Sequence, residues 1–189
     1  SKGISAFLLP NLTKKNGLDE FNFSLEIFIK YIPVIIFILF PIYPYILELW
    51  LNDQYSLMIH DLTKIFSLVA IFSCISHILV TKYESDQKSN LNFRIEIVLL
   101  PLFLLILTYL FLNTKSLIFI STLILLKEFS LILLRFYFLR YQEKKLMNYL
   151  IYLVIFPVLL ILSFFNMNLF YFLLSIIIIL TVKNVKQNN

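Results

Sequence analysis

Long apolar stretches constrain this chain more than any other feature of its sequence. A helix that crosses the hydrocarbon core of a bilayer needs about 20 mostly apolar residues. Six stretches of the chain meet or approach that length: Ile27–Leu51, Leu62–Val80, Ile95–Leu112, Ser116–Phe138, Leu146–Phe165 and the shorter Leu169–Val182. None of them alternates polar and apolar residues with a period of two, so the pattern favours helices over the strands of a membrane barrel.

The composition leads to the same conclusion. Hydrophobic residues make up 60% of the 189 residues and charged residues 14%, whereas soluble domains average about 45–50% and about 25%. A soluble fold of this size cannot bury so much apolar surface, so the lipid bilayer is the expected solvent and partner. We therefore expect an all-α, polytopic transmembrane bundle of about six spans.

The polar residues between the spans suggest how the chain is divided. Residues 1–26 are interpreted as the end of a truncated helix and a cytoplasmic loop, and residues 27–139 as four transmembrane helices. Residues 140–182 are interpreted as two peripheral transmembrane helices, because helices that are apolar all round face lipid on most sides, and residues 183–189 as a cytoplasmic tail. The chain starts without Met, and Ile4–Leu9 resembles the last turns of a helix, so we expect a part of a longer protein.

Lysine and arginine mark alternate loops. They gather in the leader, in the second-to-third loop, in the fourth-to-fifth loop and in the tail, whereas Asn52–Thr63 and Asn166–Asn168 contain none. Cytoplasmic loops of membrane proteins carry an excess of these residues. Six spans and this alternation predict that both ends lie in the cytoplasm and that the protein resides in the cytoplasmic membrane. The net charge of +5 is thereby explained without a nucleic-acid partner.

Several kinds of catalytic site are not expected. The single cysteine, Cys74, excludes an internal disulfide and a cysteine-based zinc site. No Gly-rich phosphate loop and no common hydrolase or zinc-protease motif is present. His60–Asp61 together with Asp53 is the nearest approach to an acid or metal site, and we interpret it as part of a solvated external loop. The sequence thus predicts no catalytic residue, no metal and no cofactor, and a protein that is not an enzyme.

The fourth stretch carries charges at the middle of the membrane. Lys127 and Glu128 lie about 17 Å from each end of a helix with a rise of 1.5 Å per residue. A charge at that depth costs at least about 2.5–3.5 kcal/mol. Ser121, Glu128 and Arg135 recur every seven residues and form one stripe, while Lys127 points about 100° away. We therefore expect Glu128 to be an imperfect partner for Lys127.

Two interpretations of these charges are open. Ionisable groups inside a membrane commonly mark substrate or ion pathways, so Lys127, Glu128 and Arg135 are candidates for substrate binding. The alternative is a structural ion pair with another helix.

The first two stretches supply candidates for gating or proton transfer. Lys30 and Pro41 share a face of the first stretch, which its prolines are expected to bend. They belong either to a gating helix or to a helix whose charged ends reach the two interfaces. In the second stretch, a face of small and polar residues includes His77 near the predicted inner end. This face indicates either close helix packing or contact with water, and His77 is a candidate proton site.

Two segments carry a resemblance to a known family. Ile4–Lys15 reads ISAFLLPNLTKK, and Ile46–Ser56 reads ILELWLNDQYS. The first resembles the "Leu-Pro, small polar, basic" helix end, and the second the "Leu-Trp-Leu, turn, aromatic-Ser" exit, of the C-terminal lobe of polysaccharide repeat-unit flippases. These belong to the multidrug/oligosaccharidyl-lipid/polysaccharide exporter superfamily. The family often has Gly where this chain has Asn52.

The resemblance implies a function and partners. It implies the C-terminal lobe of a two-lobed transporter, with the N-terminal lobe of the same protein as its partner. It also implies translocation of a polyprenyl-linked oligosaccharide, such as an O-antigen or capsule repeat unit, with Lys127 near the diphosphate. The alternatives are a drug or metabolite exporter of the same superfamily, a membrane-embedded glycan-pathway transferase and a non-catalytic scaffold subunit.

Overall fold

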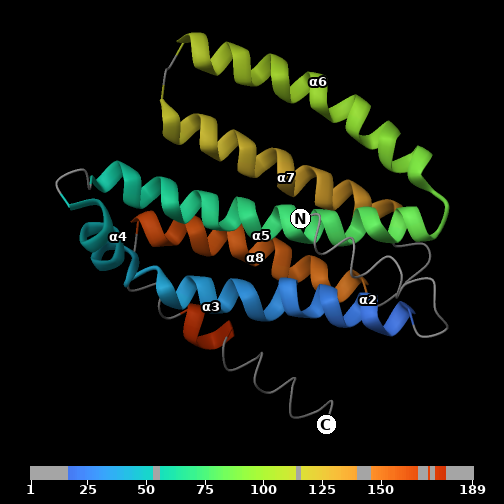
Figure 1. Cartoon of the computed structure of the whole chain (residues 1–189), viewed down its shortest axis with the longest axis horizontal. Coiled ribbons are helices and arrows are strands. Elements are labelled where there is room, and N and C mark those ends of the chain that lie inside the picture. The colour runs from blue at the N-terminus through green and yellow to red at the C-terminus, as the bar shows by residue number, and fades with distance from the viewer. Residues whose placement is uncertain are drawn as a thin grey trace.

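The fold is a bundle of long helices. The computed structural model describes residues 17–52, 56–113, 116–139, 146–165, 170 and 173–177, and no strand occurs among them. The helices are α2 (Gly17–Glu26), the π-helical turn η1 (Ile27–Tyr31), α3 (Ile32–Leu39), α4 (Tyr43–Leu51), α5 (Leu57–Ser85), α6 (Ser89–Asn113), α7 (Leu117–Leu139) and α8 (Leu146–Phe165). Figure 1 shows them as a layered bundle, with α6 and α7 on one side of α5 and with α2 and α3 on the other. The prediction of an all-α bundle of transmembrane helices is confirmed.

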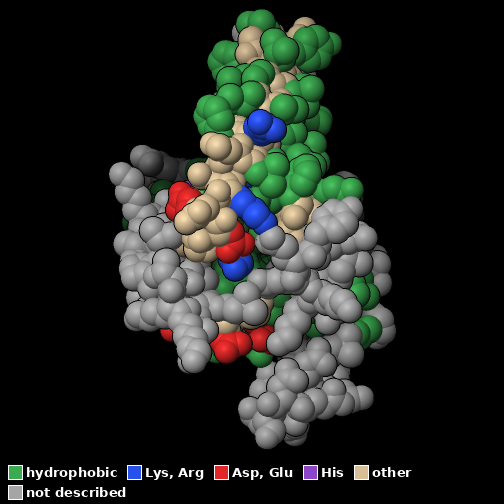
Figure 2. All heavy atoms as spheres, turned by 90° about the vertical axis from the view of Figure 1, so that its right-hand side faces the viewer, with side chains coloured by type: hydrophobic (Ala, Val, Ile, Leu, Met, Phe, Trp, Pro, Cys, Tyr) green, Lys and Arg blue, Asp and Glu red, His purple; other side chains and the backbone are tan. Residues whose placement is uncertain are grey.

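The helices are long and apolar enough to cross a membrane. Four candidate spans lie in the described residues: Asp19–Leu39, Leu57–Ser85, Ser89–Asn113 and Leu117–Leu139. The described part of α8 adds a shorter apolar helix, Ile151–Ile161. In Figure 2, hydrophobic side chains cover the upper part of the molecule, and basic and acidic side chains gather on the end that faces the viewer. A protein with an apolar flank and a charged end is suited to a bilayer. The sixth predicted stretch, Leu169–Val182, and the leader before Gly17 lie largely or wholly outside the described residues.

The first span differs from the prediction. A single helix was expected over Ile27–Leu51, but the helix already begins at Gly17 and stops at Leu39. Pro33 is the second residue of α3, with one residue between it and the π-helical turn η1, and Pro41 lies in the break between α3 and α4. Proline removes a backbone donor and crowds the preceding turn of a helix, which accounts for the irregular turn before Pro33 and for the break at Pro41. The expected bend is present, and at Pro41 it is sharp enough to make α4 a separate helix.

The second span also starts earlier than expected. Ser56 caps α5 by accepting a hydrogen bond from the backbone N–H of Ile59 at 3.4 Å. The helix therefore includes His60 and Asp61, which the sequence analysis placed in an external loop. Both residues therefore lie in a helix and not in a loop, and His60 is buried, while the Asp61 side chain stays 33% exposed. Asp53 lies outside the described residues.

One continuous apolar core joins both halves of the chain. It includes Phe37 and Phe40 from the first span, Phe72 from α5, Phe136 from α7 and Phe156 from α8. The ring centroids of Phe37 and Phe156 are 5.9 Å apart, close enough for a favourable aromatic contact.

Helix α8 was expected to be peripheral. Its buried apolar face, which includes Leu153, Phe156 and Leu159, packs against η1, α5 and α7 at the edge of the main core. Its opposite face exposes Ile151 and Val154, which agrees with contact to lipid. The least enclosed span is α6, whose buried residues are Ile95 and Phe103.

Candidate functional site

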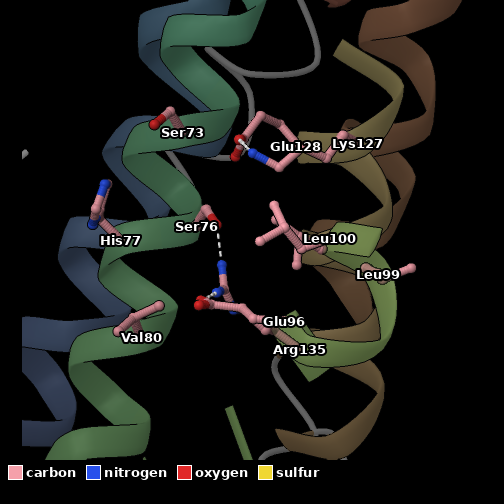
Figure 3. A pocket seen from close by; sticks show the side chains of 11 residues that line it. Ser73, Ser76, His77, Val80, Glu96, Leu99, Leu100, Lys127, Glu128 and Arg135 are labelled. Carbon is pink, nitrogen blue, oxygen red and sulfur yellow. Dashed lines mark hydrogen bonds and ion pairs between the residues drawn. The ribbon is translucent and has the colours of Figure 1, made fainter. Parts of the chain in front are cut away.

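A polar cavity of about 270 Å³ lies between α5, α6 and α7. Its polar wall brings together all three of the substrate-binding candidates with residues of the neighbouring helices, as Figure 3 shows. The polar lining residues are Ser73, Ser76, His77, Glu96, Lys127, Glu128 and Arg135. The remaining wall is aliphatic, with Leu99, Leu100 and Leu131 among its residues. Of the stripe predicted on the fourth stretch, the two charged residues, Glu128 and Arg135, thus line the cavity.

Lys127 and Glu128 form an ion pair at the midpoint of α7. Lys127 Nζ lies 3.0 Å from Glu128 Oε1, with side-chain exposures of 32% and 13%. The expectation that Glu128 is an imperfect partner is therefore wrong. Neighbouring side chains leave a helix about 100° apart, but the long, flexible lysine stem folds back to the carboxylate (Figure 3). Lys127 nevertheless lines the cavity, as expected from its direction.

Arg135 is enclosed by three helices. Its guanidinium donates to Asn92 Oδ1 at 2.8 Å, and also to Ser76 Oγ and to Glu96 Oε1. Its side chain is 3% exposed, and its backbone carbonyl accepts a hydrogen bond from the Tyr83 hydroxyl at 2.9 Å. A planar guanidinium with five donors suits such a junction. Arg135 therefore joins α5, α6 and α7, and each of its three guanidinium nitrogens already donates a hydrogen bond.

The three partners of Arg135, namely Ser76, Asn92 and Glu96, were not predicted from the sequence. Glu96 lies one residue inside the third predicted stretch, and Ser76 lies in the second stretch outside the face of polar residues that was singled out. A signal existed for Glu96, because a carboxylate inside an apolar helix needs a cation. Asn92 lies four residues before it and donates to its Oε1 at 3.3 Å. No local signal distinguishes Ser76, since its partner lies 59 residues away in the chain.

The remaining residues singled out in the sequence are dispersed. His77 lines the cavity but turns its ring away from Glu128 and Arg135 (Figure 3). Ser121 is buried and donates to the backbone carbonyl of Ile118 at 2.9 Å. Pro41 lies in the break between α3 and α4. Neither Ser121 nor Pro41 is among the residues that line the cavity.

Lys30 binds within another part of the bundle. Its Nζ lies 2.7 Å from Glu26 Oε1 and over the rings of Tyr149 and Tyr152 of α8, at 5.6 and 5.8 Å from the ring centroids. A lysine between a carboxylate and two aromatic faces is stabilised by both. Lys30 thus holds η1 against α8, and the interpretation that it simply reaches for the interface is not supported.

The small and polar face of α5 does not form the main contact with α7. The α7 side of α5 carries Phe72 and Ser76, which contact Phe129 and Arg135. On the other face, Thr63, Ser67 and Thr81 donate to backbone carbonyls four residues earlier, at 2.7–2.9 Å. Hydroxyls in helices commonly satisfy themselves in this way.

An apolar groove of about 300 Å³ adjoins the polar cavity between α6 and α7. Its walls include Phe103 and Leu107 of α6 and Leu123 and Ile124 of α7, and Lys127 lies at its border. Lys127 is therefore shared between the polar cavity and the apolar groove.

A metal site is not evident in the described part of the chain. No group of three or more His, Cys, Asp and Glu side chains there is arranged to hold a metal ion. A further buried cation that the sequence analysis did not single out is Lys64, whose Nζ lies 3.9 Å from Asp61 Oδ1 in the first turns of α5. It lies outside the polar cavity.

Comparison with protein-family models, curated proteins and solved structures finds no match to this chain. The resemblance to polysaccharide flippases accordingly stays a prediction.

Proposed function

We propose that this chain is the C-terminal lobe of a transporter that moves a polyprenyl-linked oligosaccharide across the cytoplasmic membrane. The observation that carries the proposal is the position of Lys127. It lies next to the midpoint of α7, where a polar cavity meets an apolar groove among helices suited to a bilayer. A ligand with an anionic, hydroxyl-rich head and a hydrocarbon chain has matching chemistry on both sides of this lysine.

The charge balance of the cavity defines how such a ligand binds. The cavity is lined by two cations, Lys127 and Arg135, and by two carboxylates, Glu96 and Glu128. With His77 neutral, the lining therefore carries no formal net charge. Arg135 already donates to three side chains. An incoming phosphate therefore competes with Glu128 for Lys127, the more exposed of the two cations.

This competition gives a mechanism of exchange. In the resting state Glu128 neutralises Lys127. When the head group enters, its phosphate oxygens accept hydrogen bonds from Lys127 Nζ, and Glu128 is released to accept hydrogen bonds from sugar hydroxyls. On the other side of the membrane the ion pair re-forms and the phosphate leaves. The charge at mid-depth is compensated throughout, which a buried cation requires.

The other parts of the proposal follow from the sequence. Both ends are assigned to the cytoplasm on the alternating cations of the loops. The exposed apolar surface of α6 suits contact with lipid or with the other lobe of the same protein. A second candidate, an exporter of an uncharged or zwitterionic amphiphile, is favoured by the balanced charge of the cavity.

Substitution of Lys127 tests the proposal. In vesicles that contain the full transporter, we expect Lys127→Ala to reduce transport of a polyprenyl diphosphate sugar about tenfold or more. A hydrogen bond to a charged group contributes about 1.5–3 kcal/mol, and 1.4 kcal/mol corresponds to a factor of ten. Lys127→Arg should keep part of the activity, since the charge survives while its geometry changes.

Two comparisons control this experiment. Lys88→Ala removes a lysine from the turn between α5 and α6, outside the cavity, and should transport normally. A matched amphiphile with a neutral sugar head identifies the second candidate function, because its transport should not depend on Lys127. Normal transport of the diphosphate by Lys127→Ala at normal abundance would exclude Lys127 from the mechanism.

A further inference from the structure

The short helix α4 lies beyond the length of chain that a straight membrane span needs. Asp19–Leu39 contains 21 residues, which extend about 32 Å, and the hydrocarbon core of a bilayer is about 30 Å thick. The first span is therefore complete where the chain breaks at Phe40–Ile42. A straight continuation to Leu51 would extend about 50 Å in all. Figure 1 shows instead that α4 turns out of the line of α3 at the end of the bundle.

One side of α4 rests on the protein. The Tyr43 hydroxyl lies 3.3 Å from Ser67 Oγ of α5, and the rings of Tyr43 and Phe40 are 5.4 Å apart. Leu47 and Leu51, which follow Tyr43 at intervals of four residues, are half-buried. The Tyr43–Leu47–Leu51 face thus supports α4 on the bundle.

The other side of α4 is apolar, aromatic and exposed. Tyr45 is 75% exposed, Leu49 84% and Trp50 78%. This surface continues the exposed apolar side chains of α3, which include Ile35 and Ile38. A lipid-facing surface therefore runs without interruption from the first span onto α4.

We propose that α4 lies in the plane of the bilayer interface, with its Tyr45–Leu49–Trp50 face inserted among lipid head groups and the upper parts of the acyl chains. Tyrosine and tryptophan favour this level, because their rings are apolar at one end and polar at the other. The inferred partner is the lipid surface itself. Short helices with an apolar face bind membranes in this orientation. The orientation fixes the height at which the first span and α5 sit in the membrane.

The only tryptophan in the chain is Trp50, so its fluorescence reports the depth of α4 directly. With the chain in phosphatidylcholine vesicles, we expect lipids brominated near the head group to quench Trp50 more than lipids brominated near the chain end. The corresponding depth is about 15 Å from the bilayer centre, which is half the thickness of the hydrocarbon core.

Two further variants distinguish an in-plane helix from a continued span. Tyr45→Trp and Leu49→Trp, each combined with Trp50→Phe, place the probe on the same face of α4 about 6 Å apart along the helix. An in-plane helix gives both probes the same depth, whereas a helix along the membrane normal separates them by about 6 Å. Leu102→Trp with Trp50→Phe, near the midpoint of α6 and 54% exposed, serves as the deep reference.

Four outcomes would overturn the proposal. The first three are a depth for Trp50 equal to that of the Leu102→Trp probe, a difference of about 6 Å in depth between the two α4 probes, and quenching of Trp50 by aqueous quenchers alone. Protection of Trp50 from both lipid and aqueous quenchers would also overturn it, since another protein surface would then cover α4.

Discussion

Two charge clusters on α7 lie seven residues apart and have opposite surroundings. Glu128 and Lys127 form a pair within one helix, at the border of a cavity, and Lys127 keeps 32% of its side-chain surface exposed. Arg135 has a side chain that is 3% exposed and takes partners from α5 and α6. The sequence presents both as charges in an apolar helix, yet only one of the two cations is free to exchange its partner.

The difference teaches how buried charge divides between structure and function. A buried cation that donates to side chains of two other helices contributes to the arrangement of helices, because its removal leaves several polar groups without a partner. A partly exposed pair within one helix contributes little to stability and can open to a ligand. We therefore propose that Arg135 positions α6 and that Lys127 and Glu128 contact the ligand of the proposed transporter.

The largest expected effect is that of Arg135→Met. It removes the donor for Ser76, Asn92 and Glu96, so we expect the free energy of unfolding to fall by about 3 kcal/mol. The fall is limited because the Glu96 side chain is 47% exposed and can hydrate. Thermal unfolding of the purified protein in detergent measures it. Arg94→Met, at an exposed arginine of α6, is the matched control, and equal melting temperatures for the two variants would contradict the structural role of Arg135.

A smaller effect is expected for Glu96→Gln. Glutamine keeps an oxygen that accepts a hydrogen bond from Arg135 but loses the charge, so the unfolding free energy should fall by about 0.5–1 kcal/mol. The same thermal scan measures this change, and Glu84→Gln at an exposed carboxylate of α5 gives the baseline. A loss as large as that of Arg135→Met would mean that the single ion pair, and not the three-partner junction, holds α6.

The smallest effect on stability is expected for the double variant Lys127→Met with Glu128→Gln. It removes the ion pair without leaving a charge unpaired, so the change should stay below about 1 kcal/mol. Transport of the diphosphate lipid should nevertheless be lost. The corresponding double variant Arg135→Met with Glu96→Gln should remain clearly destabilised, since Ser76 and Asn92 still lose their partner. If the two double variants melt alike, the contrast between the clusters does not hold.

The sequence by itself determined two of the helices in the later part of the chain. The predicted stretch Leu146–Phe165 coincides with α8, and Ser116–Phe138 differs from α7 by one residue at each end. Lys127 also lies next to the midpoint of α7 (Leu117–Leu139), as the length of the predicted stretch indicates. These features are local, because the apolar length of a segment and the rise of a helix fix them without reference to any neighbour.

Only the tertiary structure decided the partners. The lysine stem folds back on Glu128, Arg135 reaches residues 43 and 59 positions away, and α8 packs at the edge of the main core. Pro41 predicted a bend before α4, but the sequence did not predict that the bend would end one helix and begin another. Hydropathy describes the preference of each segment for lipid, and it is nearly equal on all faces of these apolar helices. The relative rotation and height of the helices, which choose the partner of each charge, arise from packing between segments distant in the sequence.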